Sequence, residues 1–261
     1  MTKTKAFLIH FCLSFLVVST CVSVVFFAWY PDFYFHVFGA TAVLKVLVMV
    51  DLVLGPLLTF LLYKPGKPGL LFDLSVVAFV QISALMYGMQ VAYTERPYVT
   101  VFAIDRFEVL IQGDVDMQGA DPTLLEDHYW SGPAVFVARF PEDPKERQQL
   151  IEETVFEGKP DIQKRPELWV SYDAASDDVF SRARPVKELM GNDSVADSQI
   201  EELISANGQN AELVYLPIVG KQHVFSLILD SATRLPVGLV DVDPWFDEPQ
   251  LSEAANLPAT G

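Results

Sequence analysis

Three long apolar stretches near the start of the chain constrain its fold more than any other feature. They cover residues 6–30, 37–63 and 70–93, and as helices each is long enough to cross a hydrocarbon core of about 30 Å. The first stretch is uncharged and follows Lys3 and Lys5. It is too long for the apolar region of a signal peptide and lacks a small–x–small cleavage pattern. The sequence therefore predicts three membrane-spanning helices, the first of them uncleaved.

The positions of the lysines predict how these helices are oriented. Lys3 and Lys5 precede the first helix, and Lys64 and Lys67 lie in the Pro/Gly-rich turn between the second and third. Basic residues favour the cytoplasmic ends of membrane helices. We therefore expect a multi-pass protein of a bacterial inner membrane, with a cytoplasmic N-terminus and residues 95–261 in the periplasm.

Charge separates these two parts of the chain. Residues 1–94 contain five Lys/Arg and three Asp/Glu, whereas residues 95–261 contain 13 and 31, a net charge of −18. A strongly acidic part argues against binding to nucleic acid or to anionic lipid headgroups. Both cysteines lie in the first apolar stretch. We expect two domains, a transmembrane domain of residues 1–94 and an acidic, disulfide-free domain of residues 95–261.

Alternation and turn residues predict an α+β fold for the acidic domain. Helices are expected at residues 143–157 and 197–206, and strands at 98–110, 134–140, 213–219, 223–229 and 237–242. The last three strands should form a meander. Residues 173–198 show only a weak pattern, and residues 251–261 are expected to fray.

A carboxyl group inside the second apolar stretch is the main candidate for a functional site. Asp51 lies twelve residues before Tyr63, and Gln81 lies a similar distance into the third helix. At about 1.5 Å per residue the two side chains have nearly the same depth, so we predict a hydrogen bond between them. The pair is either a proton or ion site or a structural clamp between helices. The clamp is favoured, because a transport path needs several such groups.

Other residues of the apolar stretches are expected to have supporting roles. Gly55-Pro56 removes a helix hydrogen bond and predicts an irregularity in the second helix. Lys45, in the outer half of that helix, either snorkels outward or meets a partner within the membrane. Asp73 lies near the cytoplasmic face at the depth of His10, and the two are either a pair or two separate interfacial polar residues, an interpretation at least as favoured as the pair.

The acidic domain shows no catalytic or metal-binding motif in its sequence. His128 and His223 are far apart and have no metal-ligand spacing, and phosphate-binding glycine loops and nucleophile motifs are absent. Asp241-Val-Asp-Pro-Trp245 is more unusual, and closure of the core by Trp245 is its favoured interpretation. The sequence gives no reason to expect an enzyme or a cofactor.

Several of these segments together resemble a known family, the type IV pilin accessory proteins (the TfpX/TfpZ group). The resemblance spans most of the chain, with little contribution from residues 112–210. The segments that carry it are 51–59, 66–67, 73–74, 81–88, 96–97, 101–102, 105–107, 215–221 and 241–245.

The resemblance implies an inner-membrane protein that helps to assemble or display a particular type IV major pilin, without enzymatic activity or cofactor. It also draws attention to Arg96, Asp105 and Arg106 as periplasmic residues close to the membrane. An alternative hypothesis is a membrane-anchored ligand sensor or transporter component in which Asp51 couples the outer domain to the helices. A membrane enzyme is a third, for which the sequence offers no motif.

Overall fold

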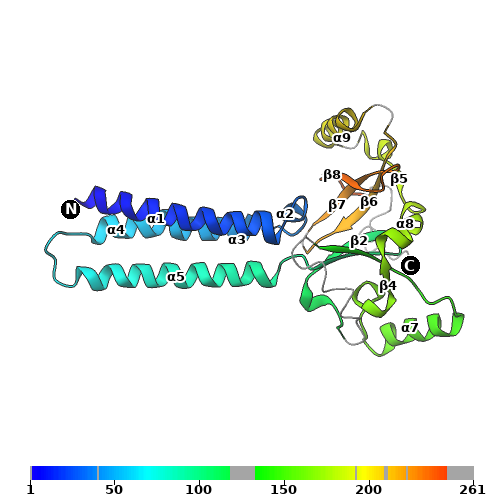
Figure 1. Ribbon diagram of the computed structural model, residues 1–261, viewed down its shortest axis with the longest axis horizontal. Coiled ribbons are helices and arrows are strands. Elements are labelled where there is room, and N and C mark those ends of the chain that lie inside the picture. Colours follow the sequence, from blue (N-terminus) through cyan, green and yellow to red (C-terminus); the bar gives the residue numbers. More distant parts are fainter. Residues whose placement is uncertain are drawn as a thin grey trace, which may run out of the picture.

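The computed structural model has two parts, a rod of long helices and a mixed α/β part at one end of it (Figure 1). It describes residues 2–39, 41–117, 133–191, 193–208, 211–221 and 223–245. The predicted architecture, three apolar helices followed by an α+β domain, is confirmed. Residues 251–261, which are expected to fray, and His128 lie outside the described residues.

Three helices of the rod are long and apolar enough to span a membrane. They cover Lys3–Trp29, Leu44–Leu62 and Leu70–Thr94. The first consists of α1 (Lys3–Val24) and a π-helical turn, Val25–Trp29, and the third is α5 (Leu70–Thr94). These two agree with the sequence prediction within a few residues.

The second helix begins later and is less regular than predicted. A short separate helix, α2 (Tyr34–Val37), ends where Gly39 takes a positive φ of 65°. The membrane helix proper then runs through α3 (Thr41–Val48), a π-helical segment Met49–Leu54, and α4 (Gly55–Leu62). The predicted start at residue 37 is therefore wrong, because the left-handed backbone at Gly39 cannot continue a right-handed helix.

The second helix lies in the middle of the rod. Both α1 and α5 pack against α4 and against the π-helical segment that precedes it. Large apolar side chains are exposed on all three helices, among them Leu16, Leu61 and Phe79. An outward-facing apolar surface of this kind fits a hydrocarbon environment and would be unfavourable in water.

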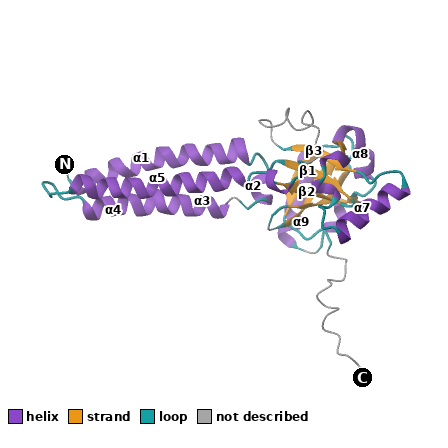
Figure 2. Ribbon diagram, turned by 90° about the horizontal axis from the view of Figure 1, so that it is seen from below, coloured by secondary structure: helices purple, strands orange, loops and turns teal. Residues whose placement is uncertain are grey.

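The outer part, as we call the part of the chain after α5, is built on one mixed sheet that lies at one end of the rod (Figure 2). The strand order in the described chain is β4-β3-β1-β2-β6-β7-β8, and β5 pairs with β6 outside this path. The strands are β1 (Val99–Ala103), β2 (Arg106–Leu110), β3 (Ala134–Ala138), β4 (Trp169–Ser171), β5 (Arg184–Pro185), β6 (Leu213–Val219), β7 (Val224–Asp230) and β8 (Pro236–Val240). The predicted meander of the last three strands is confirmed.

The single strand predicted at residues 98–110 is instead a hairpin. Strands β1 and β2 pair antiparallel across a turn at Ile104 and Asp105, with Ala103 opposite Arg106. Ile104 has a φ of 64°, a conformation uncommon for a β-branched residue. Apolar alternation continues through the turn without glycine or proline, which is why the sequence pattern did not reveal it.

Among the described residues, the helices that accompany the sheet are α7 (Pro144–Phe156), α8 (Tyr172–Phe180) and α9 (Ser194–Asn207). The first agrees with the prediction at residues 143–157, and α9 begins three residues before the predicted helix. The weakly patterned region 173–198 contains α8, which the sequence did not predict. Short 3-10 turns cover Gln112–Asp114, Ile162–Lys164, Pro166–Leu168 and Val186–Leu189.

One hydrophobic cluster joins the rod to the sheet. It includes Val25, Tyr30 and Val37 from the helical end together with Phe107 and Ile218 from the strands. Hydrogen bonds reinforce the junction: Tyr30 Oη donates to Ala92 O at 2.8 Å, and Tyr34 Oη lies 2.8 Å from Thr100 Oγ1. The outer end of the rod and the sheet therefore share one core.

Candidate functional site

A pair of polar side chains is buried between the second and third helices. Gln81 Nε2 donates to Asp51 Oδ1 at 3.2 Å and to the backbone oxygen of Asp51 at 3.4 Å. Asp51 is 5% exposed and Gln81 is 8% exposed. The hydrogen bond predicted from matched depth is therefore present.

The irregular backbone around Asp51 explains why one glutamine serves both of its oxygens. Gly55 N–H donates to Val50 O, one residue further back than in an α-helix, and Pro56 has no N–H to donate. The backbone oxygen of Asp51 thus lacks the donor that either a regular α-ladder or a continued π-ladder would supply. Gln81 donates to it, so the π-helical segment, Pro56 and Gln81 form one arrangement.

Gly55 makes room for this arrangement. A β-carbon at residue 55 would lie 2.0 Å from Gln81 Nε2, well inside any permitted contact. Gly55 and Pro56 are both buried. Glycine is therefore required here for the close approach of a side chain.

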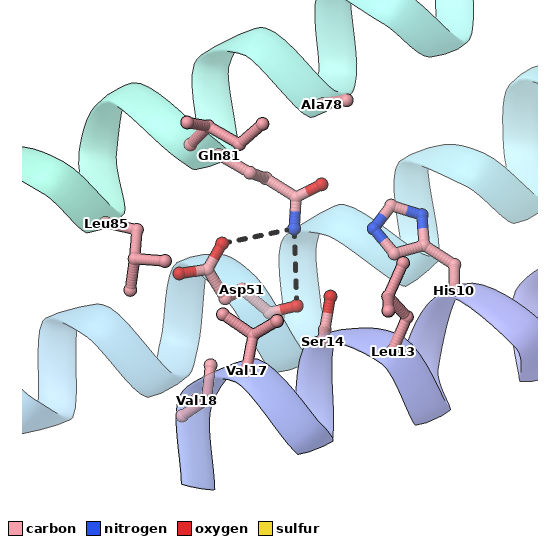
Figure 3. Close-up of a pocket in the computed structure, with 10 residues that line it drawn as sticks. His10, Leu13, Ser14, Val17, Val18, Asp51, Ala78, Gln81 and Leu85 are labelled. Atoms are coloured by element: carbon pink, nitrogen blue, oxygen red, sulfur yellow. Dashed lines mark hydrogen bonds between the residues drawn. The ribbon is translucent and has the colours of Figure 1, made fainter. Parts of the chain in front are cut away.

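A second polar contact lies toward the N-terminal end of α1. His10 Nδ1 is 2.5 Å from Thr59 Oγ1, and the His10 ring faces the Gln81 amide (Figure 3). Ser14 is also buried beside these groups. His10, Ser14 and Thr59 were not predicted from the sequence to belong to this site. Thr59 stands two turns after Asp51 on the same helix, and that spacing was the available signal.

The pairing of His10 with Asp73 is not formed. Asp73 instead accepts from Lys67 Nζ at 2.5 Å, where the turn between the second and third helices meets α5. This ion pair connects residues six apart in sequence and is partly exposed. Asp73 therefore belongs to the end of the rod and does not reach the Asp51 cluster.

A cavity of about 220 Å³ lies between α1 and α5 at the level of Asp51. Figure 3 shows the Gln81 side chain pointing from α5 toward α1, with the Asp51 carboxyl beside it. The cavity is lined by His10, Leu13, Ser14, Val17, Val18, Asp51, Ala78, Gln81, Ile82 and Leu85. Asp51 Oδ2 and Gln81 Oε1 are buried without a hydrogen-bond partner among the described residues. The polar cluster is thus incompletely satisfied.

The remaining predicted residues lie away from this cluster. Lys45 is exposed on the surface of α3. Arg96 follows α5, where its guanidinium stacks 3.7 Å from the Tyr93 ring centroid and Nη1 donates to Tyr93 O at 2.6 Å. The structure therefore groups Asp51, Gly55, Pro56 and Gln81 and separates Lys45 and Arg96 from them.

Asp105 and Arg106 form a salt bridge of 3.1 Å at the β1–β2 hairpin. The Arg106 guanidinium lies 5.3 Å from the ring centroid of Trp245, so the hairpin meets the segment after β8. Trp245 is only half-buried. Strand β8 ends at Val240, so the strand predicted to reach residue 242 is two residues too long. Among the described residues no group of three His, Cys, Asp or Glu side chains is placed to hold a metal ion.

Comparison with known proteins decides the family. Residues 1–39 match the family described as fimbrial assembly protein FimB. The chain is also 30% identical, over 243 residues, to the fimbrial assembly protein of serogroup E1 from Dichelobacter nodosus, which covers 90% of this chain and 93% of that protein. The chain belongs to the fimbrial assembly protein family. This agrees with the resemblance to the type IV pilin accessory proteins.

Further relatives carry the same description. The serogroup I protein of Dichelobacter nodosus is 31% identical over 243 residues, again 90% of this chain and 93% of the relative. The protein of serogroups C1 and C2 is 38% identical over 109 residues, 41% of this chain and 83% of the relative. No solved structure matches the chain. Membership therefore rests on sequence over almost the full length.

Proposed function

We propose that this fimbrial assembly protein is a chaperone-like accessory protein of the bacterial inner membrane. In this proposal it assists the assembly or surface display of one cognate type IV pilin. The observation that carries the proposal is the near full-length similarity to proteins described as fimbrial assembly proteins. The proposal assigns the protein no catalytic step and no cofactor.

The two-part architecture supports this role. A pilin before assembly has an apolar membrane helix and a globular head outside the membrane, as the resemblance implies. This chain offers matching elements, three apolar helices and an acidic outer part that share one hydrophobic cluster. A partner could therefore be held in the membrane and outside it at the same time.

The proposal places the three long helices of residues 1–94 across the bilayer with the N-terminus in the cytoplasm, and residues 95–261 in the periplasm. The lysines at the two ends assigned to the cytoplasm support this orientation. The acidic charge of residues 95–261 also fits an aqueous compartment. Membrane-proximal residues Arg96, Asp105 and Arg106 would then lie on the side where a pilin head is found.

Deletion of the gene tests the proposal directly. We expect fewer surface pili built from the cognate pilin, while transcription of the pilin gene stays normal. The measurement is surface pilin by immunoblot of sheared fractions, with transcript level and plasmid complementation as controls. Normal piliation and motility in the deletion strain would refute the accessory role. Restoration by an unrelated family member would refute only the specificity for one pilin.

A further inference from the structure

A cleft lies between helix α7 and the hairpin of β1 and β2, and we call it the α7 cleft. It has a volume of about 380 Å³. Of the eight large apolar side chains that the described residues of the outer part expose, four line this cleft. They are Ile104 on the hairpin, Phe140 after β3, and Ile151 and Val155 on α7. Exposed apolar side chains that gather in one place mark an interaction surface.

Helix α7 leaves most of its apolar surface uncovered. Among its residues only Leu150 is buried. Ile151 and Val155 are one turn apart and lie on the same face, with 48% and 66% of their surface exposed. A helix that packs only against its own sheet has polar residues at such exposed positions. This face of α7 is therefore available to a second molecule.

Ile104, at the tip of the hairpin, provides an independent observation. Its φ of 64° lies in the left-handed region, which β-branched residues rarely adopt. Its side chain is also 58% exposed, so packing within the chain offsets little of this strain. Asparagine would form the same turn with less strain and would be better solvated. The isoleucine is therefore unfavourable in the isolated protein, which indicates a contact with another molecule.

The charges of the cleft indicate what its partner carries. Glu108 and Asp161 line it, and neither forms an ion pair with a described residue. Glu108 accepts a hydrogen bond from Gln163 Nε2 at 3.1 Å. Arg106, the cation among the described lining residues, is already paired with Asp105. A complementary surface therefore combines apolar side chains with Lys or Arg.

Position and charge argue against two other occupants. Helix α7 lies on the side of the sheet away from the rod, so lipid around the rod does not reach the cleft (Figures 1 and 2). A second copy of this chain would bring residues 95–261, with a net charge of −18, against the same carboxylates. A different protein with a basic surface meets neither obstacle.

We propose that the α7 cleft is the docking site for the part of the cognate pilin that lies outside the membrane. The pilin binds through a surface segment in which Lys or Arg flanks apolar side chains. Ile104, Ile151 and Val155 contact the apolar side chains of that segment. Glu108 and Asp161 bind its cations. The inference rests on the proposed function, and it adds the face that holds the pilin and the chemistry of the segment that is held.

Site-specific photocrosslinking in piliated cells tests the location. A photoreactive phenylalanine analogue replaces Val155 in the cleft or, as matched control, Val195 on α9, which is 65% exposed and distant from α7 (Figure 1). We expect a crosslink from residue 155 to the pilin, identified by mass spectrometry, and little from residue 195. Equal yields at the two positions would overturn the proposal. Crosslinks from residue 155 only to a second copy, or only to residues after Trp245 of the same chain, would also overturn it.

Ile104→Asn separates partner contact from stability of the fold. Asparagine tolerates the left-handed backbone, so the thermal midpoint of the solubilised full chain should not fall. Loss of the apolar contact should lower the pilin crosslink from residue 155 by about three- to tenfold. Val195→Asn makes a similar change outside the cleft and should leave the yield unaltered. A lower midpoint in Ile104→Asn, or an unchanged crosslink, would overturn the proposal.

Asp161→Lys tests the charge of the cleft. The substitution places a cation where the partner carries one, so the crosslink yield from residue 155 should fall by about threefold or more. Glu201→Lys makes the same change in net charge at an exposed position of α9 and serves as the control. Equal yields in the two variants would overturn the proposal.

These experiments separate the docking site from the proposed function. If the pilin crosslinks to another surface of this chain while residue 155 gives no crosslink, the accessory role stands and the docking site is wrong. If the deletion strain makes normal pili, the proposed function itself is wrong. Crosslink yields are compared at equal abundance of each variant, which removes effects of misfolding.

Discussion

At the scale of single residues, Asp51 is held by a backbone defect as much as by its carboxyl group. Its backbone oxygen loses a helix donor because the π-helical turn and Pro56 interrupt the ladder, and Gln81 supplies the replacement. Unpaired polar groups are costly in hydrocarbon. The two bonds of Gln81 therefore couple the third helix to the least regular turn of the second.

Substitution of Asp51 separates a structural role from an ionic one. Asp51→Asn keeps an acceptor for Gln81 and removes ionisation, so we expect near-normal abundance and piliation. Asp51→Leu removes the acceptor and should cost about 1 kcal/mol of helix association. Membrane abundance and surface pili are measured together in both variants. Normal abundance without pili in Asp51→Asn would show that the charge of Asp51 is functional.

Gly55 gives a second test, with Gly88 as its matched control. A β-carbon at residue 55 would collide with the Gln81 amide, so Gly55→Ala should displace Gln81 and destabilise the rod by about 1–2 kcal/mol. A β-carbon at residue 88 would meet only Leu47 Cδ1, at 3.6 Å, an ordinary contact. We therefore expect Gly88→Ala to be nearly neutral in thermal unfolding of the detergent-solubilised protein. Equal losses in both would contradict the role of Gly55.

Depth along a helix made the Asp51–Gln81 pair predictable, because the rise per residue is constant and both helices meet at a short turn. The partner of His10 was not predictable in the same way. His10 was compared with Asp73 by depth alone, but Asp73 is captured by Lys67 in the turn beside it. The ion pair with Lys67 in the adjacent turn makes Asp73 unavailable to His10 on another helix. Spacing in sequence does not show which of these two contacts will form.

At the scale of elements, α2 forms the connection between the rod and the sheet. Tyr34 on α2 bonds Thr100 on β1, and Val37 closes against the β6–β7 turn, where a β-carbon on Gly220 would lie 2.1 Å from Val37 O. The ion pair between Lys221 and Glu95 ties the same turn to the end of α5. Strand β1 and the β6–β7 turn therefore both contact α2, and the same turn is also tied to the end of α5.

Buried tyrosines at this connection make stability depend on pH under alkaline conditions. Burial raises the pKa of Tyr34 to about 12, although the Thr100 hydrogen bond acts in the opposite direction. Burial also raises the pKa of Tyr30. Because the folded state disfavours the tyrosinate, this stability is fully present below pH 10, near the unfolded pKa, and declines as pH rises toward 12.

Tyr34→Phe should therefore make the alkaline decline shallower. The variant loses the Thr100 hydrogen bond, which is worth about 1 kcal/mol at neutral pH. It also lacks the phenol whose ionisation costs the wild type roughly 2 kcal/mol of stability between pH 10 and pH 12. The free energy of unfolding, followed by circular dichroism across this range, provides the measurement. Parallel pH profiles for the variant and the wild type would show that Tyr34 titrates normally.

Elements with strong periodicity were predicted well, and those fixed by long-range contacts were not. The meander β6–β8 has turn residues between apolar strands, so its order could be inferred locally. The β1–β2 hairpin turns at Ile104, where surrounding structure imposes a conformation that the residue itself disfavours. Helix α8 similarly takes its position from contacts with β3 and β4. Such elements need the tertiary structure before they can be recognised.

At the scale of the whole molecule, the proposed orientation predicts the result of reporter fusions. A periplasm-active reporter such as alkaline phosphatase should be active when fused after residue 261 and inactive when inserted at Gly66, in the turn between the second and third helices. A cytoplasm-active reporter at the same positions serves as the control and should give the opposite pattern. Exchange of the two results would invert the orientation assigned from the lysines.

The shared core between the rod and the sheet has a geometric consequence. Tyr30, Tyr34, Val37 and the Lys221–Glu95 ion pair fix the sheet to the helix ends at several points that do not lie on one line. Because these contacts come from several elements, we expect residues 95–261 to keep one orientation relative to the helices. Under the proposed function the protein would therefore select pilins by length. A pilin whose membrane helix and head are separated by a matching distance contacts both parts at once, and one with a longer or shorter connection contacts only one part.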